Sequence, residues 1–185
     1  MNARELHREQ TMTAIVEAAE ELLRVGGPEA LTAGAVAKQV GLARNSLYRY
    51  VDSMDDLRGR VVMRYLPGAV ASIQGAVDKA ASPDDALRAY IAENLQIAAT
   101  ENHACMMQLA EGVPGEASAQ IAEVHQQLID AIGRLLVPYQ VSDPALAGEL
   151  IQGVLVAGFG ALERGRSLEA VTDYCVAAAL GIVRA

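Results

Sequence analysis

The chain has 185 residues, of which 52% are hydrophobic and 21% are charged, so it can build a buried core and is not a wholly disordered chain. Ala, Leu and Val are abundant, while Trp is absent, and this composition favours helices over sheets. Two cysteines, Cys105 and Cys175, are too few for a disulfide framework, so we expect reduced, buried thiols. The formal net charge of −8 argues against a nucleic-acid binder unless the charge is unevenly distributed.

The charge does vary along the chain. Residues 1–65 contain nine basic and nine acidic side chains, whereas residues 66–185 contain six and fourteen. Within residues 32–64 the basic side chains outnumber the acidic ones by six to three. Because only the surface that meets phosphate must be basic, this segment can bind nucleic acid although the whole protein is acidic.

The sequence contains no recognisable targeting or membrane segment. Residues 1–10 carry four charged Arg and Glu side chains and no apolar run, unlike a signal peptide. The most apolar stretches, 154–162 and 174–183, are shorter than a membrane span. We therefore expect a cytoplasmic protein without a membrane partner.

The first third of the chain predicts four helices. Thr32 is placed to cap the second helix, and Gly41 ends it. Ser53 is placed to cap the fourth, with two aspartates in its first turn, and Pro67-Gly68 is expected to break or kink it. The expected helices cover 5–25, 33–40, 44–51 and a segment that begins after Ser53 and resumes after the break to residue 80.

The remainder of the chain also shows helical periodicity and strong helix starts. Ser82-Pro83 and Asp143-Pro144 each combine a capping side chain with a proline at the first helical position, and Ser167 caps the last helix. The expected helices cover 83–100, 103–111, 121–137, 144–164 and 168–183. We thus predict an all-α protein with an N-terminal three-helix domain over 1–54 and a C-terminal helical bundle over 55–185.

Residues 32–51, TAGAVAKQVGLARNSLYRYV, have the pattern of a helix-turn-helix motif. Ala37 is small where the two short helices must cross, and Gly41 lies where the turn needs a positive φ. Leu47 and Val51 would point inward, which leaves a polar outward face on the third helix. This face carries Arg44, Asn45, Tyr48 and Arg49. Arg and Asn can recognise base edges, although a solvated helix hairpin would show a similar polar face.

The segment resembles the DNA-binding domain of the TetR family of repressors over residues 8–64. The resemblance rests on G-G-x-x-A-L-T followed by A-V-A-x-x-V-G-L-x-x-x-S-L-Y-R-Y. It implies double-stranded operator DNA as partner, with Arg44, Asn45 and Ser46 reading bases. It further implies that phosphates are held by Thr32, Tyr48, Arg49 and Tyr50. Three positions depart from the family pattern, namely Ala43 at the recognition-helix cap, Val51 in place of Phe and Met54 in place of a basic residue.

The expected helix 144–163 is apolar on almost every side, so it should be buried on every side. In a small helical chain, one side can meet the core and the other a second copy, as the family resemblance also implies. A central helix of a monomer is the alternative. The expected dimer contacts are Val154, Ala157, Gly158, Ala161, Val171 and Ala178.

A group of polar and polarisable side chains in the middle of the chain is a candidate effector pocket, in line with the family's ligand-binding domain. Ordinary core packing is the alternative. The candidate residues are Tyr65, Tyr90, His103, Cys105, Met106 and Met107. No zinc-ligand spacing, phosphate-binding loop or catalytic arrangement is evident, so we expect no cofactor, no metal and no enzyme activity.

These observations predict a homodimeric repressor that a small-molecule effector releases from its operator. An effector-independent DNA-binding dimer remains an alternative. A second alternative, from another functional class, is a small helical enzyme or carrier with an incidental helix hairpin.

Overall fold

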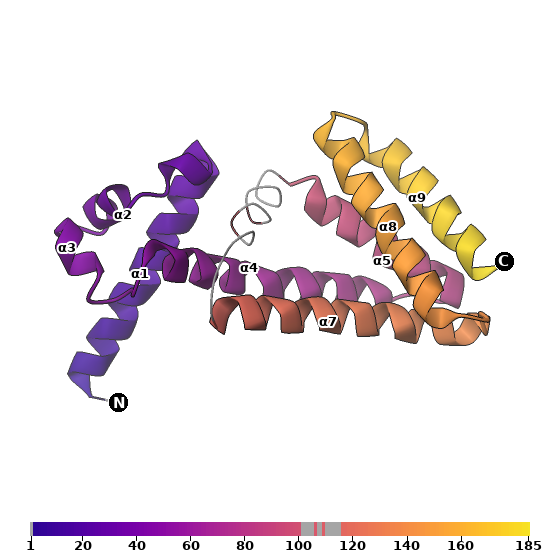
Figure 1. The fold of residues 1–185 in the computed structure, drawn as a ribbon, viewed down its shortest axis with the longest axis horizontal. Helices are drawn as coiled ribbons and strands as arrows, with labels where there is room; N and C mark the ends of the chain where they lie inside the picture. Colours follow the sequence, from indigo (N-terminus) through magenta and orange to yellow (C-terminus); the bar gives the residue numbers. More distant parts are fainter. Residues whose placement is uncertain (1, 101–105, 107–108, 110–115) are drawn as a thin grey trace. The chain divides into compact units, whose positions relative to one another are not determined.

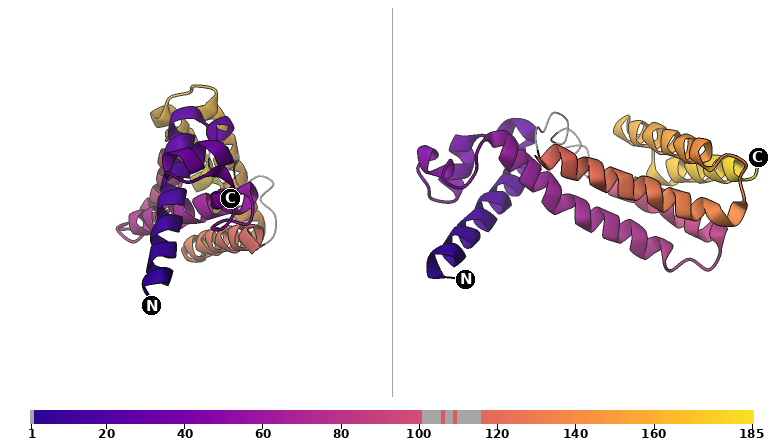
Figure 2. Two further views of the ribbon diagram at one scale, coloured as in Figure 1. Left: turned by 90° about the vertical axis from the view of Figure 1, so that its left-hand side faces the viewer. Right: turned by 60° about the horizontal axis from the view of Figure 1, so that its bottom comes forward.

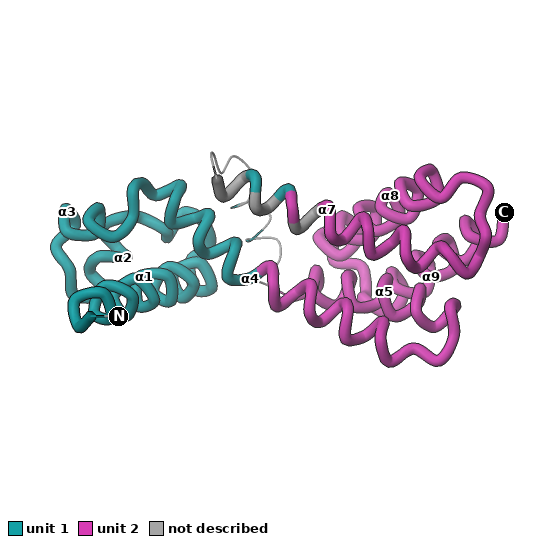
Figure 3. The backbone as a smooth tube through the Cα atoms, turned by 90° about the horizontal axis from the view of Figure 1, so that it is seen from below, with its two compact units in different colours: residues 1–65, 104–122 teal, residues 66–103, 123–185 magenta. Residues whose placement is uncertain are grey.

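The computed structural model describes residues 2–100, 106, 109 and 116–185, and every regular element within them is helical (Figure 1). The predicted all-α fold is confirmed. The chain forms two compact units, one of residues 1–65 and 104–122 and the other of 66–103 and 123–185 (Figure 3). The division in the first half of the chain falls between residues 65 and 66, inside a helix that begins at Met54.

Unit 1 contains the N-terminal helices. They are α1 (Ala3–Gly26), the 3₁₀ turn η1 (Pro28–Ala30), α2 (Ala33–Gln39), α3 (Arg44–Leu47) and the first part of α4 (Met54–Val77). Its core is formed by apolar side chains from all four α-helices, and these include Ile15, Ala19, Val36, Leu47, Leu57 and Val61. The side chain of every one of these six residues is fully excluded from solvent, so the small unit has a continuous core.

The helix starts follow the capping side chains expected from the sequence. The Thr32 Oγ1 accepts a hydrogen bond from the Ala35 backbone N–H at 3.2 Å, at the start of α2. Ser82, Asp143 and Ser167 cap their helices in the same way. Each cap satisfies one of the backbone donors that a helix start leaves unpaired.

The expected break at Pro67-Gly68 is wrong, because α4 runs without interruption from Met54 to Val77. Proline removes one backbone hydrogen bond and crowds the preceding turn. Pro67 is exposed, so solvent can compensate for the missing donor. The side chains of Leu66 and Ile73 on the same helix are buried and anchor it on either side of the proline in sequence.

Unit 2 contains the helices of the second half of the chain. They are α5 (Pro83–Ala98), the greater part of α7 (Glu116–Leu136), η2 (Val137–Tyr139), α8 (Pro144–Glu163) and α9 (Leu168–Val183), together with the end of α4. Helices α8 and α9 lie against one another, and both pack on α5 (Figure 1). Buried apolar residues from all five helices form one core, which includes Leu87, Ile91, Leu95, Ile132, Ile151, Leu155 and Ala179.

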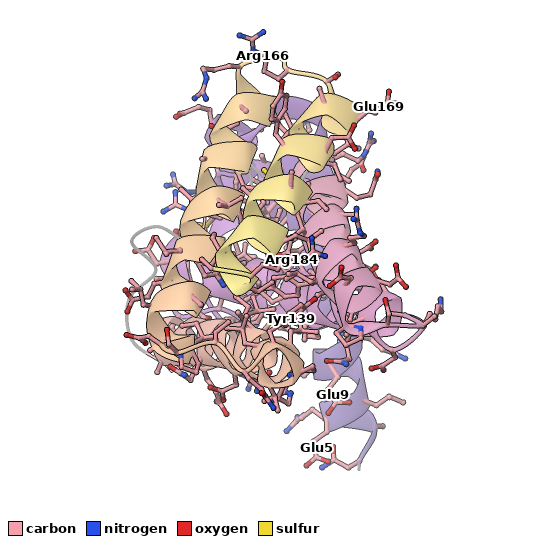
Figure 4. All side chains as sticks on the ribbon, turned by 90° about the vertical axis from the view of Figure 1, so that its right-hand side faces the viewer. Glu5, Glu9, Tyr139, Arg166, Glu169 and Arg184 are labelled. Atoms are coloured by element: carbon pink, nitrogen blue, oxygen red, sulfur yellow. The ribbon has the colours of Figure 1, made fainter. Side chains whose placement is uncertain are left out.

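A group of three polar side chains, called the polar clamp, links three segments at one end of unit 2. The Tyr139 hydroxyl donates to the Asp84 carboxylate at 3.0 Å, and Arg184 forms an ion pair with the same carboxylate. Tyr139 and Arg184 are labelled in Figure 4. Burial and the hydrogen bond to Asp84 raise the pKa of Tyr139 to about 12. The clamp joins the start of α5, the turn after α7 and the end of α9.

Helix α8 is the one described helix that is long and apolar enough to cross a membrane by length and composition, with a hydropathy of 1.6 over its most apolar window. The apolar stretch 154–162 noted in the sequence is the second half of this helix. Only 22% of that window is buried within the chain. The helix thus has an apolar surface that the protomer itself does not cover.

Candidate nucleic-acid interface

Helices α2 and α3 are joined by a tight turn that has the geometry of a helix-turn-helix. Gly41 has φ of +70°, and a Cβ built on it would meet nothing within 4 Å, so glycine is needed there for its backbone angle. The Leu42 N–H donates to the Ala37 carbonyl at 2.8 Å, which closes the turn. Ala37 is buried, as expected for a small residue where the helices cross.

Helix α3 is shorter than the 44–51 expected from the sequence, since its α-helical part covers Arg44–Leu47. The chain then continues in tight turns, with the Tyr50 N–H donating to the Leu47 carbonyl at 2.9 Å. Ala43 precedes the helix without a side-chain cap, so one of its first backbone donors lacks a side-chain acceptor. Buried Leu47 and Val51 anchor the segment on the core.

The polar residues expected to contact DNA lie on the outer surface of this segment. Arg44, Asn45, Tyr48 and Arg49 are exposed, and Ser46 and Tyr50 are half-buried. Thr32 is also exposed; its hydroxyl oxygen accepts the capping bond of α2, which leaves its hydroxyl proton able to donate outward. All seven candidate residues belong to the same compact unit.

The arginines of α4 differ from those of the helix-turn-helix in their ionic partners. Arg58 pairs with Asp55 at 2.7 Å and Arg60 with Asp56 at 2.9 Å. Arg64 lies 3.3 Å from a carboxylate oxygen of Glu17. The basic excess of residues 32–64 is therefore partly neutralised.

The cations of α2, α3 and the turn after α3 lack such partners. No described carboxylate lies within ion-pair distance of Lys38, Arg44 or Arg49, and all three side chains are exposed. An unpaired exposed arginine can bind phosphate or guanine without first breaking an internal ion pair. The helix-turn-helix thus carries three exposed cations that are available to an external anion.

The start of α4 carries acidic rather than basic side chains. The Asp56 N–H donates to the Ser53 hydroxyl at 3.0 Å, and the Asp52 N–H donates to the Asp56 carboxylate at 3.0 Å. Met54, which takes the place of a basic residue in the family pattern, is half-buried. The backbone N–H groups of Asp52 and Asp56 are thus already paired, and carboxylates lie beside them.

The candidate effector residues are only partly described. His103, Cys105 and Met107 lie outside the described residues. Tyr90 is buried in the core of unit 2, whereas Met106 is buried and Tyr65 half-buried in unit 1. Burial raises the pKa of Tyr90 to about 12, and a hydrogen bond with the Gln152 side chain offsets part of that rise. Tyr90 is therefore a core residue with a polar partner on α8.

Unit 2 has surface grooves at other positions. One of about 860 Å³ lies between α7 and α8, with Ile132, Gly133 and Gly148 among its lining residues. Another of about 540 Å³ lies between α5 and α9, with Arg88 and Arg184 at its edge. Neither is lined by Tyr65, Tyr90 or Met106. Within the described part of the chain, no three His, Cys, Asp or Glu side chains are grouped as a metal site requires.

The candidate dimer residues point in two directions. Gly158 and Val171 are buried inside the protomer, Val154 and Ala161 are half-buried, and Ala157 and Ala178 are exposed. Sequence reasoning missed the most exposed apolar side chains of α8 and α9. These are Leu146, Leu150, Val156 and Tyr174, of which Val156 is 64% and Tyr174 81% exposed. A helix that is apolar on every side gives no signal for which side faces its own core.

Comparison with known proteins identifies the N-terminal domain. Residues 15–61 match the family model of the bacterial regulatory proteins of the tetR family, which covers the helix-turn-helix. No curated protein sequence matches the chain.

Solved structures of low sequence identity share the fold along nearly the whole chain. SCO4454, a TetR-family transcriptional regulator from Streptomyces coelicolor, is 15% identical with a TM-score of 0.74, and the alignment covers 95% of both chains. FadR from Bacillus subtilis, solved with stearoyl-CoA, is 18% identical with a TM-score of 0.70, over 89% of this chain and 95% of that one. AibR, solved with isovaleryl coenzyme A and operator DNA, is 17% identical with a TM-score of 0.70, over 90% and 96%.

The family match covers the segment whose geometry was described above, and the structural likeness extends to the helical second unit. Residues 15–61 therefore match the DNA-binding domain of the tetR family, and the chain as a whole has the fold of solved TetR-family regulators.

Proposed function

We propose that the protein is a cytoplasmic, homodimeric transcriptional repressor that binds a palindromic operator through α3 and leaves it when a small molecule binds. The proposal assigns no enzyme activity to the chain. Its main support is the set of exposed cations Lys38, Arg44 and Arg49, which have no carboxylate partner within the described residues. Such freely available positive charge favours phosphate binding.

Recognition of the operator bases is assigned to the first turn of α3. Arg44 and Asn45 are exposed there, and their side chains can form paired hydrogen bonds with guanine and adenine edges. Ser46 is the third residue assigned to base recognition. The phosphate contacts are assigned to Thr32, Tyr48, Arg49 and Tyr50, which fix the register of the protein on the duplex.

Dimerisation is assigned to the uncovered apolar face of α8 and α9. Val156 and Ala157 on α8 are exposed, as are Tyr174 and Ala178 on α9. Charges are rare on this face of α8, and small residues permit close approach of a second copy. A two-fold dimer presents two α3 helices to half-sites about 34–36 Å apart.

The effector is assigned to the class of acyl-CoA thioesters. Two proteins of the same fold were solved with such ligands, isovaleryl coenzyme A in AibR and stearoyl-CoA in FadR. An effector that binds the DNA-free form more tightly weakens operator binding by the same factor, at about 1.4 kcal/mol for each tenfold change. An effector-independent dimer would lack this coupling.

Selection of binding sites from a random duplex library tests the DNA-binding function. We expect a palindromic consensus whose half-sites are about one helical turn apart, bound by the dimer with strong salt dependence. A protein that selects no sequence and binds DNA without salt dependence contradicts the proposal.

Calorimetry tests the effector on the selected operator. Isovaleryl-CoA and stearoyl-CoA are titrated into the free protein and into its operator complex, with free CoA as control. A ligand that binds both forms with equal affinity does not act as an inducer. Absence of binding by both thioesters excludes this class as effector and leaves the DNA-binding function intact.

A further inference from the structure

The first two turns of α1 extend beyond the body of unit 1. The buried residues of α1 begin at Ile15, whereas residues 2–10 are all exposed. At a rise of 1.5 Å per residue, residues 3–10 form an overhang of about 12 Å. This overhang lies before the segment matched by the family model, which begins at residue 15.

The overhang has a defined helix start. The Glu5 N–H donates to the Asn2 side chain at 2.9 Å, and the Asn2 N–H donates to the Glu5 carboxylate at 2.8 Å. This reciprocal pair is a capping box, which satisfies two backbone donors and opposes fraying. A helix without apolar contacts is thus held in shape at its free end.

Two unpaired arginines lie on one face of the overhang. Arg4 and Arg8 are four residues apart and therefore neighbours along the helix. Ile15 and Ala19 follow them by eleven residues each, which is about three helical turns. Both Ile15 and Ala19 are fully buried against unit 1, so the arginines share the face with which α1 packs on that unit.

The acidic residues of the overhang do not neutralise these arginines. No described carboxylate lies within ion-pair distance of Arg4 or Arg8. The Glu5 carboxylate is turned back to the helix start by its bond to Asn2. Figure 2 (left) faces the end of unit 1 that carries α3, and the first half of α1 lies in open view there and extends past α2 and α3.

We propose that Arg4 and Arg8 bind backbone phosphates of the DNA that flanks each operator half-site, and so lengthen the footprint of α3. The inference rests on the proposed operator binding. Its support is the charge complementarity of two free guanidinium groups with phosphate and the continuity of the overhang with the DNA-binding unit. Because phosphates carry no base identity, these contacts raise affinity without changing the consensus.

The test compares wild type with the double variant Arg4→Gln/Arg8→Gln on a duplex selected from random sequence. Each phosphate contact contributes about 0.9 to the slope of log K against log salt, so four lost contacts per dimer lower the slope by about 3.6. The variant keeps the wild-type consensus, and its hydroxyl-radical footprint loses the outermost protected sugars. Shortening the flanks weakens wild type but not the variant.

Two controls separate this role from general effects of charge or folding. Arg164→Gln/Arg166→Gln makes the same charge change at the exposed turn between α8 and α9, and it should leave the slope unchanged. Arg4→Lys/Arg8→Lys keeps the charge and should retain most of the slope. Circular dichroism checks that all variants remain helical.

If wild type selects an operator and Arg4→Gln/Arg8→Gln keeps the full slope and footprint, the inference is overturned and operator binding stands. If wild type selects none, the proposed function itself fails.

Discussion

Gly158 on α8 lies directly against Cys175 on α9, because a Cβ built on this glycine would be 3.0 Å from the Cys175 Sγ. The same Cβ would be 2.8 Å from the Leu95 Cδ2 on α5. Gly158 therefore allows three helices of unit 2 to meet closely. The Cys175 thiol is buried there, and burial raises its pKa, which keeps it in the uncharged form.

We expect Gly158→Ala to lower the free energy of unfolding by about 1–3 kcal/mol, because the added methyl group overpacks this contact. Urea denaturation at a fixed protein concentration measures the change. Gly133→Ala on α7 is the matched control, since a Cβ there meets nothing within 4 Å and alanine favours the helix. Equal midpoints for the two variants would contradict the close packing.

Several features of the fold were predictable because they depend on local chemistry. A capping side chain such as Thr32 or Ser82 acts within one helical turn, so the sequence locates it. The break predicted at Pro67 was wrong, since buried neighbours on α4 outweigh the local cost of proline. A local pattern carries no information on such tertiary compensation.

The direction of side chains on α8 was less predictable. Gly158 and Ala157 are adjacent small residues, yet one packs on α5 and α9 while the other faces solvent. On an amphipathic helix the polar side would have identified the outer face. Since α8 has almost no polar side, only the packing of unit 2 distinguishes its two faces.

Arg44→Ala is expected to weaken operator binding and to relax base preference at one position in each half-site. Arg44 is exposed at the first turn of α3 and has no ionic partner among the described residues. A paired Arg–guanine contact contributes about 1–3 kcal/mol of discrimination. Site selection with the variant measures the effect, and Arg60→Ala, which removes an arginine paired with Asp56, is the control. An unchanged consensus for Arg44→Ala would refute the assignment.

Tyr48→Phe is expected to weaken binding to specific and scrambled duplexes by the same factor. The Tyr48 ring is exposed, and its hydroxyl is assigned to phosphate, which positions the protein without reading bases. Fluorescence anisotropy on both duplexes measures the two losses. A loss confined to the specific duplex would show that Tyr48 reads sequence instead.

Alkaline pH should destabilise unit 2 through Tyr90. Burial raises its pKa from 10.0 to about 12, so the folded state keeps a proton that the unfolded state has lost in that interval. The stabilising contribution is complete below pH 10 and is lost as the pH rises toward 12, at about 1.4 kcal/mol per unit. Urea midpoints from pH 8 to 11 should fall less steeply for Tyr90→Phe than for wild type. Parallel plots of urea midpoint against pH for the two proteins would contradict the role of this hydroxyl. Tyr139, whose pKa is also raised, remains in both proteins, so its titration does not distinguish them.

The last prediction concerns the uncovered apolar face of α8. Val156 is 64% exposed in the protomer, so Val156→Glu costs little in an isolated chain, but it would bury an unpaired carboxylate in a dimer. We expect sedimentation to show folded monomers and operator affinity to fall steeply, because one half-site alone binds weakly. Val137→Glu is the matched control, since this valine is 72% exposed on η2, outside α8 and α9, and the variant should remain dimeric. Because Val154 and Phe159 also pack on the core, glutamate there would confuse loss of the interface with loss of folding. A Val156→Glu protein that stays dimeric and keeps its operator affinity would place the interface elsewhere on the molecule.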